Sequence, residues 1–250
     1  MIGALADLSF VVVDVETSGW LHEQGEITEI GAVRLTGGQV TGEFSSLVRP
    51  RGAIPASITT LTGITDDMVG RAPQPAAALR AFLAFASDSV LVAHNAPFDL
   101  AFLTAACAAC QITWPPAPVL DTAVLARLVL GPDDVPDCRL STLADYFAAK
   151  TLPCHRALAD AKATADVLTG LLSASAGSWP TRQPTLIRRL ADPAVRYWRG
   201  WGARSRPAQE ASYGHRNRLD QGRRGPHPRD RGGDREDPRG QRGLLGDRRV

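Results

Sequence analysis

A short apolar strand that ends in two acidic residues constrains this chain more than any other feature. Residues Leu8 to Asp14 form a valine-rich run, which predicts a strand buried on both faces. Asp14 and Glu16 are separated by one residue, so in an extended chain both side chains point to the same face. Buried carboxylates side by side repel each other and raise each other's pKa. This strand therefore ends at a site that compensates negative charge, or at an exposed edge where the two acids are solvated.

The pattern after this strand predicts a mixed α/β domain. A second strand is expected over 29–35 and a third over 40–48, with a turn between them, which favours an antiparallel meander. Helices are expected over 73–86, 97–110, 122–130, 140–149 and 156–172, with a short strand over 89–93. Strands followed by alternating strands and helices indicate a mixed central sheet flanked by helices, within a domain of residues 6–175.

Two further acids and a histidine are placed to join Asp14 and Glu16. Asp99 lies in the first turn of the helix after strand 89–93, at the sheet end that Asp14 occupies, although a helix N-terminus by itself favours an acid. Asp160 interrupts an alanine-rich helical face, where an unpaired carboxylate is costly. His155 precedes that helix, and a lone histidine there is more often a capping or surface residue. Mg²⁺ and Mn²⁺ prefer such oxygen ligands, so converging acids indicate a metal site.

These motifs together resemble those of the DEDDh-type 3′–5′ exonuclease family, which includes the proofreading epsilon subunit of bacterial DNA polymerase III. The resemblance rests on Val13 to Thr17, on His94 to Asp99, and on His155 with Asp160, in that order. The segment from Ile58 to Thr65 is also similar to the family's segment between the first two motifs. The similarity spans about residues 8–173 and implies a ribonuclease H-like fold.

The resemblance implies a phosphodiester hydrolase that releases nucleoside 5′-monophosphates from 3′ ends by a two-metal mechanism. His155 would be the general base. The ligands of two Mg²⁺ or Mn²⁺ ions, which also count as catalytic, would be Asp14, Glu16, Asp99 and Asp160. Contacts to the terminal nucleotide would come from Glu16, Thr17, Leu61, Asn95 and His155.

The expected substrate is a single-stranded or frayed DNA 3′ end, because Leu61 to Ile64 is more similar to the polymerase-associated branch of the family. The expected setting is replication proofreading or repair, with a DNA polymerase as a candidate partner. An exoribonuclease of the oligoribonuclease or tRNA-trimming type is an alternative with the same site. A catalytically silent nucleic-acid-binding module is an alternative of another class, against which the intact acids and His155 argue.

The charge is unevenly distributed along the chain. Residues 201–250 hold 13 arginines and 7 acids, a net +6, which leaves 15 basic and 19 acidic residues, a net −4, in residues 1–200. A polyanionic substrate therefore needs compensation from metals or arginines near the site. Four arginines are candidates, although each is more simply explained as a solvated charge: Arg49, Arg51, Arg71 and Arg156.

The C-terminal fifth of the chain lacks apolar periodicity. Residues 176–201 are predicted to be a linker, with a short helix around Leu186 to Leu190 as an option, and residues 202–250 a disordered basic tail. This tail is either a nucleic-acid tether or the product of a GC-rich coding sequence translated out of frame.

The sequence also gives an expectation for cellular location and for the cysteines. No apolar run reaches the roughly 18 residues of a membrane helix, and the N-terminus lacks signal-peptide features, so we expect a cytoplasmic protein without membrane partners. Cys107 and Cys110 have C-x-x-C spacing, but without a second close pair we expect buried thiols rather than zinc ligands.

Overall fold

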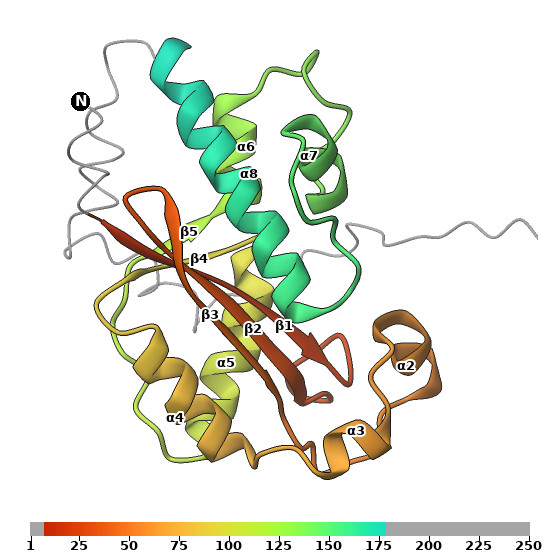
Figure 1. The fold of residues 1–250 in the computed structure, drawn as a ribbon. Helices are drawn as coiled ribbons and strands as arrows, with labels where there is room; N and C mark the ends of the chain where they lie inside the picture. Colours follow the sequence, from red (N-terminus) through yellow and green to blue (C-terminus); the bar gives the residue numbers. More distant parts are fainter. Residues whose placement is uncertain (1–7, 179–250) are drawn as a thin grey trace, which may run out of the picture. The chain divides into compact units, whose positions relative to one another are not determined.

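The computed structural model describes residues 8–178, so the predicted tail and the predicted linker beyond residue 178 lie outside the described residues. The strands are β1 (Ser9–Thr17), β2 (Ile27–Thr36), β3 (Gln39–Leu47), β4 (Val90–Ala93) and β5 (Val119–Asp121) (Figure 1). The helices are α2 (Ala56–Thr62), α3 (Asp66–Gly70), α4 (Pro75–Phe85), α5 (Ala96–Ala109), α6 (Thr122–Val129), α7 (Leu140–Tyr146) and α8 (Ala157–Ser178). Within this part of the chain, no helix is both long enough and apolar enough to cross a membrane.

The strands form one mixed sheet in the order β3-β2-β1-β4-β5. β1 pairs with β2 and β2 with β3 in antiparallel fashion, which confirms the predicted meander. β4 is parallel to β1 and to β5. α2, α3 and α4 precede β4, and α5 lies between β4 and β5, so the chain has the long crossover connections that parallel pairing needs. The prediction of a mixed sheet flanked by helices, in the ribonuclease H-like arrangement, is confirmed.

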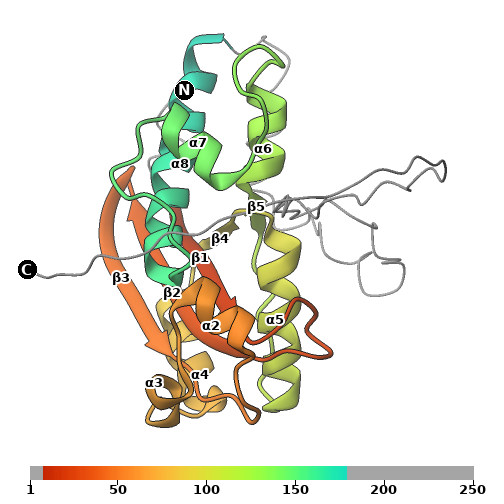
Figure 2. The same cartoon turned by 90° about the vertical axis from the view of Figure 1, so that its right-hand side faces the viewer.

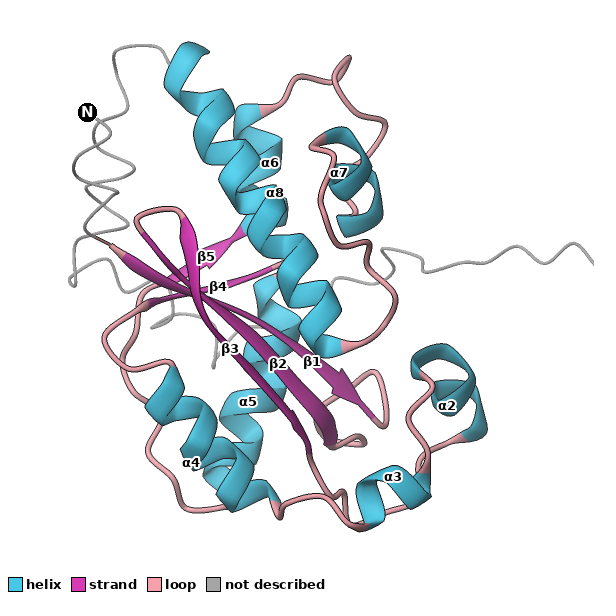
Figure 3. Ribbon diagram, viewed as in Figure 1, coloured by secondary structure: helices cyan, strands magenta, loops and turns pink. Residues whose placement is uncertain are grey.

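Alternating side chains of the central strand serve two separate cores. Val11 and Val13 pack with α4 and α5 on one face, whereas Val12 packs with α6, α7 and α8 on the other. Figures 2 and 3 show helices on both sides of the sheet. The period of two in an extended chain therefore places every second residue of β1, including Asp14 and Glu16, on the α8 face.

Three elements were not predicted, and one was predicted too long. α2 and α3 are 7 and 5 residues long, and β5 is 3 residues long, too short for periodicity to mark them. The helix expected over 140–149 ends at Tyr146, because Phe147 caps it and Ala148 has a φ of 51° outside the helical region.

Gly31 allows the first turn of α8 to lie directly against the sheet. A Cβ atom on Gly31 would lie 2.1 Å from the backbone nitrogen of Leu158 and 2.2 Å from the carbonyl carbon of Ala157. Gly31 is also the register partner of Asp14. The absence of a side chain at this position therefore brings the start of α8 beside the acidic end of β1.

Replacement of Gly31 by alanine is expected to destabilise the domain, because the atoms that the new methyl group would meet are backbone atoms of α8, which cannot move aside as a flexible side chain would. We expect a loss of at least about 2 kcal/mol in the free energy of unfolding, at the upper end of ordinary overpacking. Urea denaturation measures this loss. Gly70→Ala is the matched control, because a Cβ there would meet no atom within 4 Å. Equal stability of the two variants would contradict the close contact.

Candidate active site

The acidic end of β1 faces the start of α8. Glu16 lies opposite Glu29 in the antiparallel pairing, and Asp14 lies opposite Gly31, so these positions share one face of the sheet. Glu16 is 9% exposed and Asp14 is partly buried. Two unlinked acids at a solvated strand end would not be enclosed in this way, so the exposed-edge alternative fails for this strand.

Asp99 reaches β1 from the first turn of α5. β4 runs parallel to β1 and leads into this helix, which brings its N-terminus to the carboxyl end of β1. The Asp99 carboxylate accepts a hydrogen bond from the backbone nitrogen of Val15 at 3.0 Å, and the residue is 3% exposed. The helix dipole favours an acid here, but only the topology accounts for its bond to the residue between Asp14 and Glu16.

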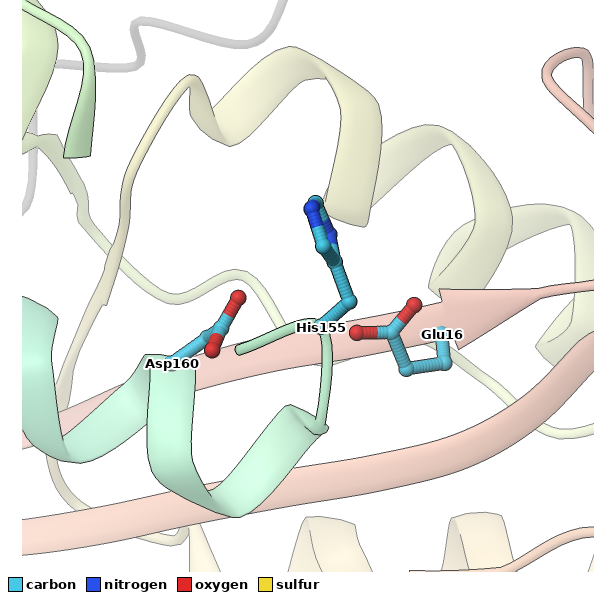
Figure 4. Close-up of side chains that lie close together, drawn as sticks. All are labelled: Glu16, His155 and Asp160. Carbon is cyan, nitrogen blue, oxygen red and sulfur yellow. The ribbon is translucent and has the colours of Figure 1, made fainter. Parts of the chain in front are cut away.

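Glu16, His155 and Asp160 lie together around one space. Figure 4 shows Glu16 on β1, Asp160 on the first turn of α8, and His155 on the loop before that helix. One ligand atom from each lies within 4.8 Å of the others, the arrangement expected of a metal site. Asp160 also accepts a hydrogen bond from the backbone nitrogen of Cys154 at 2.8 Å. His155 is exposed and has a φ of 57°, a backbone conformation that is uncommon for residues other than glycine.

Burial and mutual repulsion raise the pKa values of these acids. Burial, with repulsion from Asp160 as the next contribution, raises the pKa of Glu16 to about 8. Burial raises the pKa of Asp99 to about 8, although the bond from Val15 opposes this. The pKa of Asp14 rises well above its usual range because of burial and the neighbouring carboxylates, and burial also raises that of Asp160. Ionisation of all four crowded carboxylates is therefore costly unless a positive charge binds beside them.

The donor set fits a divalent cation. Within residues 8–178, neither lysine nor arginine forms an ion pair with Asp14, Glu16, Asp99 or Asp160. Carboxylate oxygens are the ligands that Mg²⁺ and Mn²⁺ prefer. Arg156 lowers the pKa of Glu16 only as the smallest of several effects, so a bound cation would supply most of the compensating positive charge.

The predicted substrate contacts have different surroundings. The hydroxyl of Thr17, which is 6% exposed, donates to the carbonyl oxygen of Gly19 at 2.6 Å. Asn95 is exposed, and its side chain makes no capping bond to α5. Its φ of 62° is in the left-handed region, which asparagine adopts more readily than most residues, so the backbone conformation alone explains an asparagine at this position. Leu61 is 39% exposed on α2, which Figures 1 and 2 place beyond the carboxyl end of β1.

Asp121 is a structural acid that the sequence analysis missed. Its carboxylate accepts hydrogen bonds from the backbone nitrogens of Asn95 and Ala96, before and at the start of α5, and of Ala123 and Val124 at the start of α6. It therefore fixes the N-terminus from which Asp99 projects. The signal was an aspartate directly before an apolar helical segment, which is a common N-cap.

Glu29 and Arg156 form an ion pair that was also missed. The interpretation of Arg156 as a solvated charge is wrong, because its guanidinium binds the Glu29 carboxylate at 2.7 and 3.0 Å. Arg51 likewise pairs with Glu26 at 2.8 Å, while the Nε of Arg49 is buried without a hydrogen-bond partner. The signal for Glu29 was an acid inside the apolar run of β2, where burial demands a partner.

Comparison with known proteins identifies related domains. Residues 11–168 match the family model described as exonuclease. A Mycobacterium tuberculosis protein named as a bifunctional exonuclease/endonuclease is 53% identical over 175 residues, which are 68% of this chain and 27% of that protein. A PolC-type DNA polymerase III of Caldanaerobacter subterraneus is 42% identical over 65% of this chain and 11% of its own length. This chain thus corresponds to a minor part of either relative.

A solved structure agrees with these matches. Exonuclease X in complex with 5′ overhanging duplex DNA is 27% identical, with a TM-score of 0.55, over 71% of this chain and 98% of that one. The similarity therefore extends over almost the whole of that exonuclease.

The raised pKa values predict an unusual pH dependence of stability. Between the ordinary value of 4.5 and about 8 for Glu16, the folded protein binds more protons than the unfolded chain. The free energy of unfolding of the metal-free protein therefore falls as the pH rises through this window. Thermal unfolding in EDTA should show a falling melting temperature from pH 5 to pH 8, and Mn²⁺ should raise it most at pH 8. A melting temperature that rises with pH in EDTA would contradict the crowded carboxylates, and Glu16→Gln should flatten the slope.

Proposed function

This chain belongs to the exonuclease family, and we propose that it is a metal-dependent 3′–5′ exonuclease that acts on DNA ends. The observation that carries the proposal is the convergence of Glu16, His155 and Asp160, with Asp99 bound to the same stretch of β1. These residues come from three separate parts of the chain, and a folded domain has no structural need to crowd acids in this way.

The chemistry follows from the donor set. Two Mg²⁺ or Mn²⁺ ions held by Asp14, Glu16, Asp99 and Asp160 would stabilise the charge on the attacking and leaving oxygens of the phosphodiester. His155 is exposed beside these carboxylates, so its imidazole can take a proton from the attacking water. Proton removal, in-line attack and departure of the 3′ oxygen would release a nucleoside 5′-monophosphate.

The substrate preference is supported by the relatives. Exonuclease X was solved with duplex DNA, and the PolC-type relatives are DNA polymerases. We infer a DNA 3′ end as substrate, single-stranded or frayed, with Thr17, Leu61 and Asn95 contacting the terminal nucleotide. Proofreading or repair beside a DNA polymerase is the role we propose for this activity.

A direct assay tests the activity and its direction. DNA and RNA oligonucleotides of equal length, labelled at the 5′ end, are incubated with the full chain in Mg²⁺, Mn²⁺ or EDTA. We expect stepwise shortening from the 3′ end, abolished by EDTA, and at least about a tenfold preference for DNA, which equals about 1.4 kcal/mol in the transition state. Internal cleavage or activity in EDTA would overturn the proposal, and a preference for RNA would assign the chain to the exoribonuclease type.

Single substitutions test the assigned roles. His155→Ala should lower kcat by about 10²- to 10⁴-fold, because it removes the general base but leaves the carboxylates in place. Asp14→Asn should abolish activity and weaken Mn²⁺ binding, measured by calorimetry. Asp67→Asn removes an exposed acid of α3 and should leave both quantities unchanged. Full activity of His155→Ala would remove the imidazole from the mechanism.

A further inference from the structure

We propose that Glu29 and Arg156 form a positioning pair that holds the His155 loop in its catalytic orientation. This inference rests on the proposed function, because it assigns the pair a role in the same reaction. Glu29 lies on β2 opposite Glu16, and Arg156 directly follows His155. The pair therefore connects the sheet to the residue beside the proposed general base.

Three hydrogen bonds to one carboxylate define the pair. Oε2 of Glu29 accepts from Nε of Arg156 and from the backbone nitrogen of Ala157, both at 3.0 Å. Oε1 accepts from Nη2 of Arg156 at 2.7 Å. The two parallel bonds fix the plane of the guanidinium, and the third fixes the first residue of α8. One side chain of β2 thus holds both residues that follow His155.

Because Glu29 is buried, loss of this ion pair costs more free energy than loss of a surface ion pair. Glu29 is 3% exposed, whereas the Arg156 side chain is 42% exposed. A buried carboxylate left without its partner carries a large desolvation cost, so the structure has a strong preference for the paired geometry. Surface pairs such as Lys162 with Glu43, which joins α8 to β3, lack this constraint because both partners are partly solvated.

The loop needs to be held because His155 has an unfavourable backbone conformation. Its φ of 57° lies in the left-handed region, which costs free energy for a residue with a side chain. The backbone nitrogen of Cys154 on one side is bound by Asp160, and that of Ala157 on the other is bound by Glu29. The histidine therefore lies between two carboxylate anchors, and only one of them belongs to the proposed metal ligands.

Its ion pair distinguishes Glu29 from the neighbouring acids. Glu16, directly opposite, forms no ion pair with an arginine or lysine among the described residues, whereas Glu29 is paired with Arg156. Glu29 thus holds the His155 loop, whereas the other acids nearby are the proposed cation ligands. Its oxygens are already occupied by three donors, which leaves it poorly suited as a metal ligand.

The test is the substitution Glu29→Gln. Glutamine keeps the shape, but its amide nitrogen must face one of the three donors, so the loop loses at least one bond. We expect kcat to fall by about 10- to 100-fold, which is the loss that a displacement of a catalytic group by about 1 Å causes. KM should change by less than about threefold. Arg156→Lys keeps the positive charge without the two parallel bonds and should show a similar loss. Glu43→Gln removes the ion pair between Lys162 of α8 and β3 and should retain wild-type kcat.

A double-substitution cycle separates positioning from general damage. If Glu29 acts through His155, Glu29→Gln should lower kcat by less than about twofold in a His155→Ala background. Hydrogen exchange at the Ala157 amide supplies a readout independent of activity and should be faster in Glu29→Gln but unchanged in Glu43→Gln. Each assay is run below the melting temperature of the variant, measured in parallel.

The outcomes separate this inference from the proposed function. An inactive wild-type chain would overturn both. An active wild type that Glu29→Gln matches in kcat would overturn the positioning role alone. Equal losses from Glu29→Gln in the presence and absence of His155 would also overturn it, because the pair would then act on the fold and not through the imidazole.

Discussion

The contact between the first turn of α8 and the backbone of β2 is the constraint on which the site depends. Gly31 provides the space, since any Cβ would collide with Ala157 and Leu158. Glu29, two residues earlier on the same face, provides the attraction by binding Arg156 and Ala157. Without this close approach, Asp160 and His155 would be displaced from β1 and could not meet Glu16. One residue without a side chain and one buried acid together set the geometry.

The electrostatics follow from how the acids of this region are paired. Glu29 forms an ion pair with Arg156, whereas Asp14, Glu16, Asp99 and Asp160 form none with an arginine or lysine in the described part of the molecule. Desolvation dominates the raised pKa values of these four groups, and mutual repulsion adds to it for Asp14 and Glu16. The fold therefore stores an unfavourable interaction at one place, and a divalent cation is the ligand that relieves it. Stability and ligand binding are linked through the same four groups.

Sequence pattern predicted the parts of this domain that are long and periodic. The apolar run from Leu8 and the helical spacing around Leu79 are long enough to predict β1 and α4. The spacing of Asp14 and Glu16 predicted that both side chains lie on one face of β1. Gly31, Asp121 and Glu29 act through contacts with residues that are distant in the sequence, and α2, α3 and β5 are too short to show a period. Arg156 was misinterpreted because its partner lies 127 positions away. The local sequence pattern indicates which residues are buried, but not which buried groups contact each other.

The backbone supports the acids before any cation binds. Asp99 is held by the nitrogen of Val15, and Asp160 by that of Cys154. Each bond lowers the pKa of its carboxylate against the larger effect of burial, so it favours the charged form that a cation requires. Because these donors belong to the main chain of β1 and of the loop before α8, they keep the carboxylates oriented without adding competing positive charge. Ligands held in this way lose little conformational freedom on binding, and the free energy of cation binding is not spent on arranging them.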